Sequence, residues 1–251
     1  MTNLVLAEQN GSVLEVVLNR PEKKNALTLA MYQQATDFLR AATEDKSINV
    51  VILRGAGSSF SAGNDIMDFV ASADNPDAIQ IIIDFLHTLA SFPKPVVAAV
   101  QGNAVGIGTT MLLHCDLVVA GEDLRCQMPF IKLGLVPEGG STLLFPAMLG
   151  HRVAFELMVE GVPFDAYKAE RLGVINQIVP NENLLTQARS RAEMLSKLPQ
   201  NSVMTSKKLM KKEYLQQLHR VMDEEGKLFY ESLFSAEAKE AFTAFLQGKS
   251  K

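Results

Sequence analysis

The sequence predicts an α/β protein in which buried strands alternate with amphipathic helices. The helical segments are periodic, and strands that alternate with helices favour a sheet covered by helices. The chain has 251 residues, 47% of them hydrophobic, which is enough to bury a sizeable core. Short runs rich in Val, Ile and Leu that end in turn residues indicate the strands; in order they are VLEVVLNRP, VVILRGAG, PVVAAVQGN, DLVVAGED and VINQIVP.

Two segments between these runs carry a clear helical pattern. The first, LTLAMYQQATDFLRAATED, contains Thr28 as its expected N-cap, and the second, AIQIIIDFLHTLASF, follows the turn-like sequence DNPD. After about residue 195 the composition is almost wholly helical. We therefore expect a core over residues 1–195 and a C-terminal helical region over residues 196–251, whose apolar side chains cover either the core or a neighbouring subunit.

Charge and composition exclude several classes of function. The net charge is −4 and the 24 Lys and Arg residues are scattered, so no nucleic-acid partner is expected, and KKLMKK is expected to be a solvated helix face. No long uncharged apolar run or leader pattern occurs, which indicates a cytoplasmic chain without a membrane span. Cys115 and Cys126 lack metal-ligand spacing and are expected to be reduced core residues; no metal is expected.

Two glycine-bearing loops follow strand-like runs and are candidates for ligand binding. They are FSAGNDI at 60–66 and QGNAVGIGTTMLLHCD at 101–116. In the second loop Gly106 and Gly108 flank Ile107 just before an expected helix start, where free N–H groups favour negative charge. Tight turns packed in the core remain an equally good interpretation of the residues alone.

Other glycine motifs fail on position. A dinucleotide fingerprint that starts at Gly106 requires glycine at position 111, where Met111 stands, and no phosphate-binding GxxxxGK[ST] loop occurs. A hydrolase elbow that starts at Gly139 requires glycine at position 143, where Leu143 stands. Nucleotide and serine-hydrolase chemistry are therefore not expected.

Glu138 is the most unusual charged residue in the sequence. It lies in LGLVPEGGS, between two apolar runs, where a carboxylate is costly unless it is paired or used. The residues alone allow two interpretations, a turn residue that faces water or a reagent in a buried pocket.

Taken together, these segments resemble the enoyl-CoA hydratase/isomerase (crotonase) superfamily over essentially the whole chain. The resemblance implies a spiral of repeated ββα units, a C-terminal helical trimerisation region, and a homotrimer or hexamer. It also implies acyl-CoA substrates whose thioester oxygen is bound by two backbone N–H groups. The segments that carry it are LNRPEKKNALT, FSAGNDI, KPVVAAVQGNAVGIG, CDLVVAGED, PFIKLGLVPEGGST and AERLGVINQIVP.

By this resemblance the oxyanion hole consists of the amides of Asn64 and Ile107, which stabilise the enolate formed next to the thioester. The two positions at which hydratases of the family carry glutamates are Thr110 and Phe130 here. Neither can act as a carboxylate base. Glu138, by contrast, falls where Δ3,Δ2-enoyl-CoA isomerases of the peroxisomal type carry their single catalytic glutamate.

One carboxylate suffices for isomerisation because the proton taken from C2 can be returned by the same residue at C4. We expect an apolar shell to exclude water and raise the pKa of Glu138. Pro137 and the two glycines after Glu138 are expected to fix the turn that aims it. The expected shell residues are Phe130, Leu133, Val136 and Leu143.

The resemblance also implies residues that bind the substrate. The loop EKKNALT and the backbone after Phe60 are expected to contact the adenine and pantetheine of coenzyme A, with Asp65 bonding locally. Coenzyme A enters as part of the substrate, and no cofactor is expected. The expected binding residues are Lys24, Asn25, Ala26, Leu27, Ser61, Ala62, Gly63, Asp65, Gly106, Gly108, Thr110 and Phe130.

The sequence therefore favours an isomerase that converts 3-enoyl-CoA to trans-2-enoyl-CoA in fatty acid β-oxidation. Two alternatives remain. One is another crotonase reaction through the same enolate, such as enoyl-CoA hydration or isomerisation of a ring substrate. The other is a member that binds acyl-CoA without turning it over.

Overall fold

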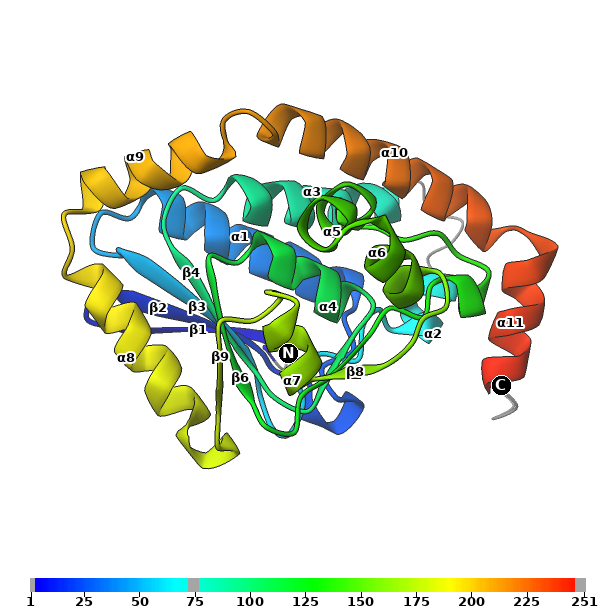
Figure 1. Cartoon of the computed structure of the whole chain (residues 1–251), viewed down its shortest axis with the longest axis horizontal. Helices are drawn as coiled ribbons and strands as arrows, with labels where there is room; N and C mark the ends of the chain where they lie inside the picture. The colour runs from blue at the N-terminus through cyan, green and yellow to red at the C-terminus, as the bar shows by residue number, and fades with distance from the viewer. Residues whose placement is uncertain (1–2, 72–76, 247–251) are drawn as a thin grey trace.

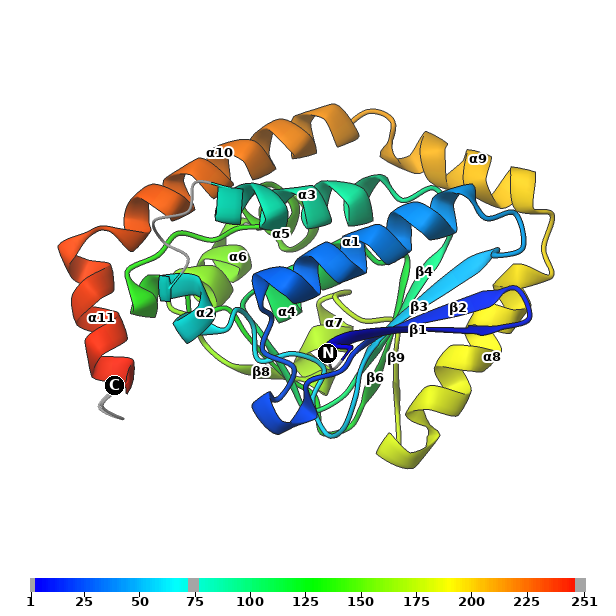
Figure 2. The same ribbon diagram turned by 180° about the vertical axis from the view of Figure 1, so that it is seen from behind.

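A six-stranded sheet forms the centre of the computed structural model, which describes residues 3–71 and 77–246 (Figures 1 and 2). Its strand order is β1-β2-β3-β4-β6-β9. β1 pairs antiparallel with β2, and every later pair is parallel. The strands are β1 (Val5–Asn10), β2 (Val13–Leu18), β3 (Val50–Gly55), β4 (Val96–Val100), β6 (Leu117–Gly121) and β9 (Gln177–Val179).

A second sheet of three short strands lies next to the first, and its strands reveal a repeated order of elements along the chain. It consists of β5 (Asn103–Val105), β7 (Arg125–Gln127) and β8 (Phe164–Asp165). The chain runs from β4 into β5 and then a helix, and from β6 into β7 and then further helices. After β3, Ser61 forms a parallel bridge to Ala104 before the next helix begins. This strand, strand, helix order confirms the predicted α/β spiral of ββα units.

Helices cover both faces of the large sheet and extend along the top of the molecule in Figure 1. Short 3₁₀ turns occur at Pro21–Lys23, Met111–His114, Ile131–Leu133 and Asn181–Asn183. The helices are α1 (Leu29–Glu44), α2 (Ile66–Ala71), α3 (Asp77–Ser91), α4 (Ile107–Thr110), α5 (Ser141–Leu149), α6 (His151–Met158), α7 (Ala166–Arg171), α8 (Leu184–Ser196), α9 (Gln200–Lys211), α10 (Leu215–Leu233) and α11 (Ala236–Leu246).

The strands are apolar on both faces because both faces are covered. In β4, Val97 and Ala99 belong to a small cluster with Ala188 and Ala192 of α8. The alternate residues of the same strand belong to the larger core on the side of α1 and α3. This explains why β4 is a continuous apolar run instead of an alternating one.

The five strand-like runs of the sequence correspond to β2, β3, β4, β6 and β9. The Thr28 hydroxyl accepts a hydrogen bond from the Met31 amide, as expected of an N-cap. β1 and the strands of the small sheet were not predicted. β1 is largely exposed, and the small-sheet strands have only two or three residues, so neither leaves an apolar run.

The predicted helical C-terminal region contains α9, α10 and α11, and α10 runs over α3 (Figure 1). Leu218, Met222 and Phe229 of α10 are buried against the core of the same chain. The division at residue 195 stays a prediction, and residues 247–251 lie outside the described chain. No helix in residues 3–71 and 77–246 is long and apolar enough to cross a membrane.

The KKLMKK segment is only partly the solvated face that we expected, since Lys208 and Lys212 are exposed whereas Lys207 and Lys211 are not. Lys207 is buried, and its Nζ donates to the Lys94 carbonyl at 2.8 Å and pairs with Asp116 at 2.6 Å. The Lys211 Nζ donates to the Ala90 carbonyl at 3.0 Å, and burial lowers the pKa of Lys211 to about 8. For Lys207 and Lys211 the prediction failed because charge counting cannot identify lysines whose amines bind carbonyl groups beneath the helix.

Candidate active site

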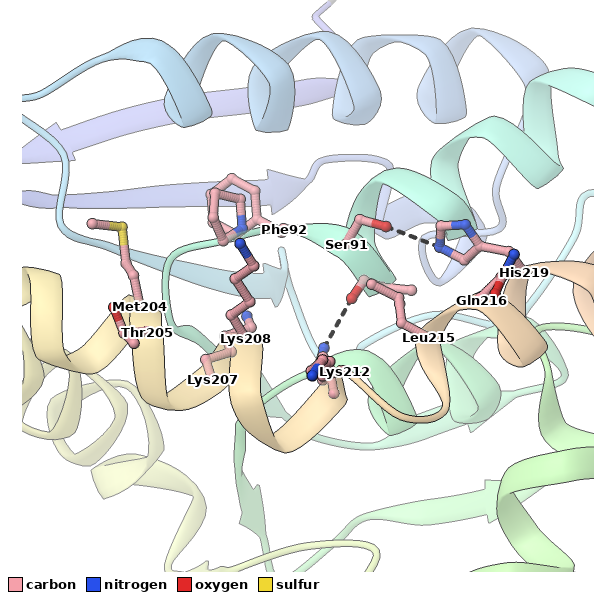
Figure 3. Close-up of a pocket in the computed structure, with 13 residues that line it drawn as sticks. Ser91, Phe92, Met204, Thr205, Lys207, Lys208, Lys212, Leu215, Gln216 and His219 are labelled. Carbon is pink, nitrogen blue, oxygen red and sulfur yellow. Dashed lines mark hydrogen bonds between the residues drawn. The ribbon is translucent and has the colours of Figure 1, made fainter.

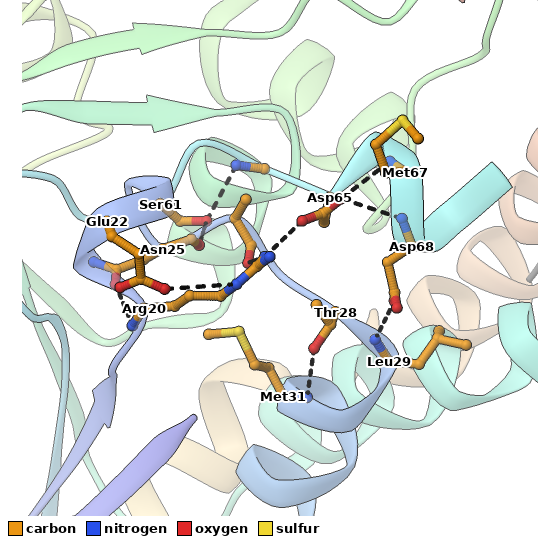
Figure 4. A network of polar contacts seen from close by, with 12 residues as sticks. Arg20, Glu22, Asn25, Thr28, Leu29, Met31, Ser61, Asp65, Met67 and Asp68 are labelled. Carbon is orange, nitrogen blue, oxygen red and sulfur yellow. Dashed lines mark hydrogen bonds and ion pairs between the residues drawn. The ribbon is translucent and has the colours of Figure 1, made fainter. Parts of the chain in front are cut away.

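Two loops that are distant in the sequence lie side by side at one side of the site (Figure 4). The Ala62 amide donates to the Lys24 carbonyl at 2.9 Å, and the Leu27 amide donates to the Gly63 carbonyl at 2.8 Å. The Ser61 hydroxyl donates to the Asn25 carbonyl at 2.9 Å. The loops expected to contact coenzyme A are therefore one structural unit.

Asn25 holds this unit together with its side chain. Its Nδ2 donates to the carbonyls of Ala56 at 2.8 Å and Ser59 at 2.7 Å, and its Oδ1 accepts from the Arg20 amide. Asn25, Leu27 and Ser61 are buried, whereas Lys24 is exposed and Ala26 and Ala62 are partly exposed. Coenzyme A contact at this loop stays a prediction, which Lys24, Ala26 and Ala62 are best placed to fulfil.

Asp65 bonds locally, as the sequence analysis expected. Its carboxylate forms an ion pair with Arg20 at 2.6 Å and accepts hydrogen bonds from the amides of Met67 and Asp68 at the start of α2 (Figure 4). Partial burial pushes the pKa of Asp65 upward, but Arg20 and the two amides outweigh burial and lower it. The Asp65 carboxylate is therefore ionised, and both of its oxygens already have partners within the chain.

The second glycine loop lies against the first. The Ser61 amide donates to the Asn103 carbonyl at 2.9 Å, and the Val105 amide donates to the Ser61 carbonyl at 3.0 Å. Among the described residues, the amides of Asn64 and Ile107 have no protein acceptor. Both residues line one cavity of about 70 Å³, together with Gly63, Gly106 and Phe130. Two unoccupied donors thus belong to the walls of a single cavity.

The turn after Glu138 depends on two glycines. Gly139 and Gly140 both have positive φ angles, +73° and +70°, which other residues adopt only with strain. His114, buried inside the turn, donates from Nε2 to the Gly139 carbonyl at 2.8 Å, and burial lowers the pKa of His114 to about 3. A neutral imidazole therefore fixes the turn without adding charge.

Glu138 is a buried carboxyl group, 6% exposed, in this turn. The Thr110 hydroxyl donates to Oε1 at 2.6 Å, whereas Oε2 has no partner in the described chain. Burial raises the pKa of Glu138 to about 8; the Thr110 hydrogen bond opposes the rise and the charge of Glu225 adds to it. One oxygen is thus held in place and the other is free to exchange a proton.

A second cavity, of about 10 Å³, lies beside Glu138 and shares Asn64 and Phe229 with the first. The predicted shell was partly wrong, because Phe130 and Leu133 line the first cavity, and Val136 and Leu143 line neither. Sequence reasoning missed the actual walls, since α3 and α10 meet only in the folded chain. They are Ile79, Ile82, Ile83, Leu86, Met222, Gly226 and Phe229.

Tyr32 orients Asn64 at the junction of the two cavities. Its hydroxyl donates to Asn64 Oδ1 at 2.5 Å. Burial, followed by the nearby charge of Glu138, raises the pKa of Tyr32, so the phenol is a neutral donor. The sequence analysis did not identify Tyr32, because nothing in helix α1 distinguishes it from an ordinary core aromatic.

Glu225 of α10 supports the Glu138 turn from outside. One oxygen accepts from the Gly140 amide at 2.6 Å, and the other accepts from the Thr142 amide at 2.9 Å and hydroxyl at 2.5 Å. Burial raises the pKa of Glu225, and these donors oppose the rise. Since all three partners are donors, we assign the ionised form.

A larger cavity, of about 660 Å³, lies elsewhere between α3, α9 and α10 (Figure 3). Ser91 and His219 form a hydrogen bond of 2.9 Å there, and Lys208 and Lys212 line it. Neither Glu138 nor the glycine loops contribute to it. In the described chain, no group of three or more His, Cys, Asp or Glu residues could hold a metal ion.

Comparison with known proteins gives a consistent result. Residues 8–251 match the family model described as enoyl-CoA hydratase/isomerase. Enoyl-CoA delta isomerase 2 of Rattus norvegicus is 34% identical over 98% of this chain, which spans 64% of the rat protein. The 1,2-epoxyphenylacetyl-CoA isomerase of Escherichia coli is 32% identical over 100% of this chain and 98% of its own length. The solved structure of OdaA from Pseudomonas aeruginosa is 42% identical, with a TM-score of 0.94 over 98% of this chain and 99% of that chain.

Proposed function

Because the chain belongs to the enoyl-CoA hydratase/isomerase family, we propose that it isomerises 3-enoyl-CoA to trans-2-enoyl-CoA with Glu138 as the sole proton shuttle. The observation that carries the proposal is the state of Glu138: buried, held at one oxygen by Thr110 and unpartnered at the other. A carboxylate in this state is a strong and mobile base.

In the first step, Glu138 Oε2 takes a proton from C2 of the substrate. The electrons of the C–H bond delocalise toward the thioester oxygen and form a dienolate. The amides of Asn64 and Ile107, which line the neighbouring cavity without protein acceptors, donate to that oxygen. Each such donor lowers the barrier by about 3 kcal/mol in comparable sites.

In the second step, the protonated Glu138 returns the proton to C4, and the double bond moves to C2–C3. Because Thr110 holds Oε1 in place, Oε2 both takes the proton from C2 and returns it to C4. The apolar walls from α3 and α10 exclude water, which would otherwise protonate the dienolate or exchange with the carried proton. These steps transfer only a proton, and we propose no cofactor beyond the coenzyme A of the substrate.

The residues around the two cavities favour isomerisation over hydration. Hydration requires a second group that positions and activates water, and Glu138 is the only carboxylate among the described residues that line either cavity. Thr110 and Phe130 occupy the two positions at which the family resemblance expects glutamates. Thr110 instead orients Glu138.

We also propose that the chain assembles as a homotrimer or a hexamer. Large apolar side chains of the C-terminal helices are exposed in the single chain, and a partner subunit would cover them. Light scattering coupled to gel filtration would measure the assembly, and a monomer at micromolar concentration contradicts it. The side chains are Leu209, Met210, Leu228 and Phe234.

The decisive experiment replaces Glu138 with Gln and follows conversion of 3-hexenoyl-CoA. We expect kcat to fall by roughly 10²- to 10⁴-fold, as is normal for loss of a general base. Glu138→Asp, which keeps the carboxylate but shortens the side chain, is the matched variant and should retain more activity. If Glu138→Gln keeps its activity within about tenfold of wild type, Glu138 is not the base.

A second readout separates the base from the particular reaction. Exchange of the C2 hydrogens of butanoyl-CoA with D₂O requires a base and an oxyanion hole but no double bond. Loss of exchange in Glu138→Gln, together with absent turnover of every 3-enoyl-CoA, would assign Glu138 to a different crotonase reaction. Binding without exchange or turnover in the wild-type protein would favour the non-catalytic alternative.

A further inference from the structure

The two cavities of the site differ greatly in size, and the difference bears on which acyl groups the protein accepts. The cavity at the glycine loops measures about 70 Å³ and the cavity at Glu138 about 10 Å³. A space of 10 to 15 Å³ on this scale holds about one water molecule. The two cavities share Asn64 and Phe229 and are therefore adjacent, so an acyl group that lies in the first can reach Glu138 if these side chains make way for it.

The far walls of the smaller cavity are tightly packed. Ile82 and Ile83 of α3 are 4% and 7% exposed, and Met222 and Phe229 of α10 are 1% and 3% exposed. Protein interiors of this kind pack like organic crystals and do not open for extra methylene groups without a penalty. The cavity therefore has a closed end.

Gly226 of α10 lies directly against Ile83 of α3 at this end. A Cβ atom placed on Gly226 would lie 2.4 Å from Ile83 Cδ1, well inside the contact distance of two carbon atoms. Helix α10 thus lies directly against α3 at this level in the described chain, with Ile83 filling the space above Gly226. This contact would stop an acyl chain from passing between the two helices.

Among the described residues that line the smaller cavity, Glu138 alone carries a charge, and Glu138 and Asn64 alone have polar side chains. A polar or charged end on the acyl group would lose its water without gaining a partner. The closed end accordingly selects for apolar as well as short groups.

Building on the proposed function, we propose that the site takes short, unbranched, apolar acyl-CoA substrates of about four to six carbons, with Ile83, Met222 and Gly226 setting the limit. Carbons C2 to C4 must lie beside Glu138 for the proton to be moved. On the scale given above, the smaller cavity has room for about one further heavy atom, so at most one or two carbons follow C4.

The test is the affinity of saturated butanoyl-, hexanoyl- and decanoyl-CoA, measured by calorimetry. Saturated thioesters bind without isomerising, and the shared coenzyme A part cancels in the ratio between them. We expect decanoyl-CoA to bind at least about tenfold more weakly than hexanoyl-CoA, because its tail must force the packed walls apart. An open channel predicts the reverse, about fourfold tighter binding for each added methylene. Equal or tighter binding of decanoyl-CoA overturns the proposal.

Two variants should move the limit in opposite directions. Ile83→Ala removes part of the closed end and should raise the decanoyl-to-hexanoyl affinity ratio by about tenfold or more. Gly226→Ala pushes a methyl group against Ile83 and should lower the ratio of hexanoyl-CoA affinity to butanoyl-CoA affinity by about fivefold. If neither ratio moves, these side chains do not set the limit and the proposal fails.

Matched controls lie on the same two helices. Gln80→Ala on α3 and Lys227→Ala on α10 replace exposed residues and should leave both ratios unchanged. Ile83→Val serves as a milder variant if Ile83→Ala folds poorly, and a ratio of two ligands on one preparation is independent of the folded fraction. Binding is also independent of turnover, so retained activity in Glu138→Gln would remove the proposed reaction and leave the size limit to be judged separately.

Discussion

Glu15 and Glu138 are both buried glutamates, yet their surroundings are opposite. Glu15 of β2 is 3% exposed and forms ion pairs with Arg54 at 2.7 Å and Arg189 at 2.5 Å. Burial alone would raise the pKa of Glu15, but the two arginines outweigh it and lower the pKa. Glu138 is 6% exposed, and in the described chain it pairs with no cation and keeps one oxygen without a partner. Two arginines thus balance the charge of buried Glu15, whereas no cation in the described chain balances the charge of Glu138.

The difference separates a carboxylate that supports the fold, Glu15, from the one that we propose as the base, Glu138. A carboxylate whose lone pairs are filled by arginines cannot accept a proton from a substrate at neutral pH. A carboxylate held by one hydroxyl can, and the free energy lost by leaving it unpaired is tolerated where function requires it. Four predictions test this contrast.

The largest expected effect is that Glu138 and Glu15 make the free energy of unfolding depend on pH in opposite directions. Glu138 has a pKa of about 8 in the folded chain against an ordinary value of 4.5, so the folded state binds the extra proton between these values. The stabilisation from this proton is complete below pH 4.5. As the pH rises from 4.5 to 8, the free energy of unfolding falls by about 5 kcal/mol. Urea unfolding of wild type and Glu138→Gln across this range should show the difference.

Glu15 should behave in the reverse sense, because its pKa is lowered in the folded chain. Its stabilisation is present above its ordinary pKa and is lost as the pH falls through the folded value. The same urea series with Glu15→Gln provides this comparison. For Glu138, the prediction is wrong if the difference in the free energy of unfolding between wild type and Glu138→Gln stays constant from pH 4.5 to 8. Its pKa is then not raised.

The second prediction concerns Glu15→Gln at pH 7. Removing the carboxylate leaves Arg54 and Arg189 without their shared partner, but Arg54 keeps Glu8 and Arg189 is partly exposed, so the free energy of unfolding should fall by about 2 kcal/mol. Glu15 lines neither cavity of the site, so kcat of the folded protein should stay within about twofold of wild type. A strong loss of kcat without loss of stability would reverse the roles assigned to the two glutamates.

The third prediction is that Thr110→Val lowers activity at neutral pH. The Thr110 hydroxyl lowers the pKa of Glu138, and a hydrogen bond to a charged group is worth about 1.5 kcal/mol, or one pKa unit. The acid limb of the kcat/KM profile should therefore move up by about one pH unit, with roughly a tenfold loss at pH 7. Thr109→Val is the neighbouring control. An unshifted limb would show that Thr110 does not act through the Glu138 charge.

The smallest expected effect is that of Glu225→Gln. Removing its charge should lower the pKa of Glu138 and move the acid limb down by about half a pH unit, because Glu225 is the charged group that raises this pKa and the nearby Tyr32 is neutral. Glu224→Gln, next to it and exposed, is the matched control. Measuring kcat/KM from pH 5 to 9 distinguishes this shift from simple misfolding, which would scale the whole profile.

Much of the fold and the central residue of the site could be predicted from the sequence. The buried strands appear as apolar runs, Thr28 caps its helix, and Glu138 is conspicuous because a lone charge interrupts an apolar stretch. Periodicity shows which face of α3 and α10 is buried but not what that face contacts. The walls around Glu138 could therefore not be predicted, because they depend on the packing of α3 against α10.

Lys207 and Glu225 illustrate the same limit for polar residues. Both look like ordinary surface charges of amphipathic helices, but one binds the Lys94 carbonyl and Asp116 and the other binds the turn after Glu138. Their roles depend on partners 83 or more residues away, which a local pattern cannot encode.

Helix α10 has a consequence for the order in which the protein becomes active. It supplies Met222 and Phe229 to the walls around Glu138 and Glu225 to the turn, although it is among the last elements to leave the ribosome. Until it docks, Glu138 faces water and its pKa stays near the ordinary value. Under the proposed function, a protected dienolate can therefore form only after synthesis has delivered α10 and the helix has docked.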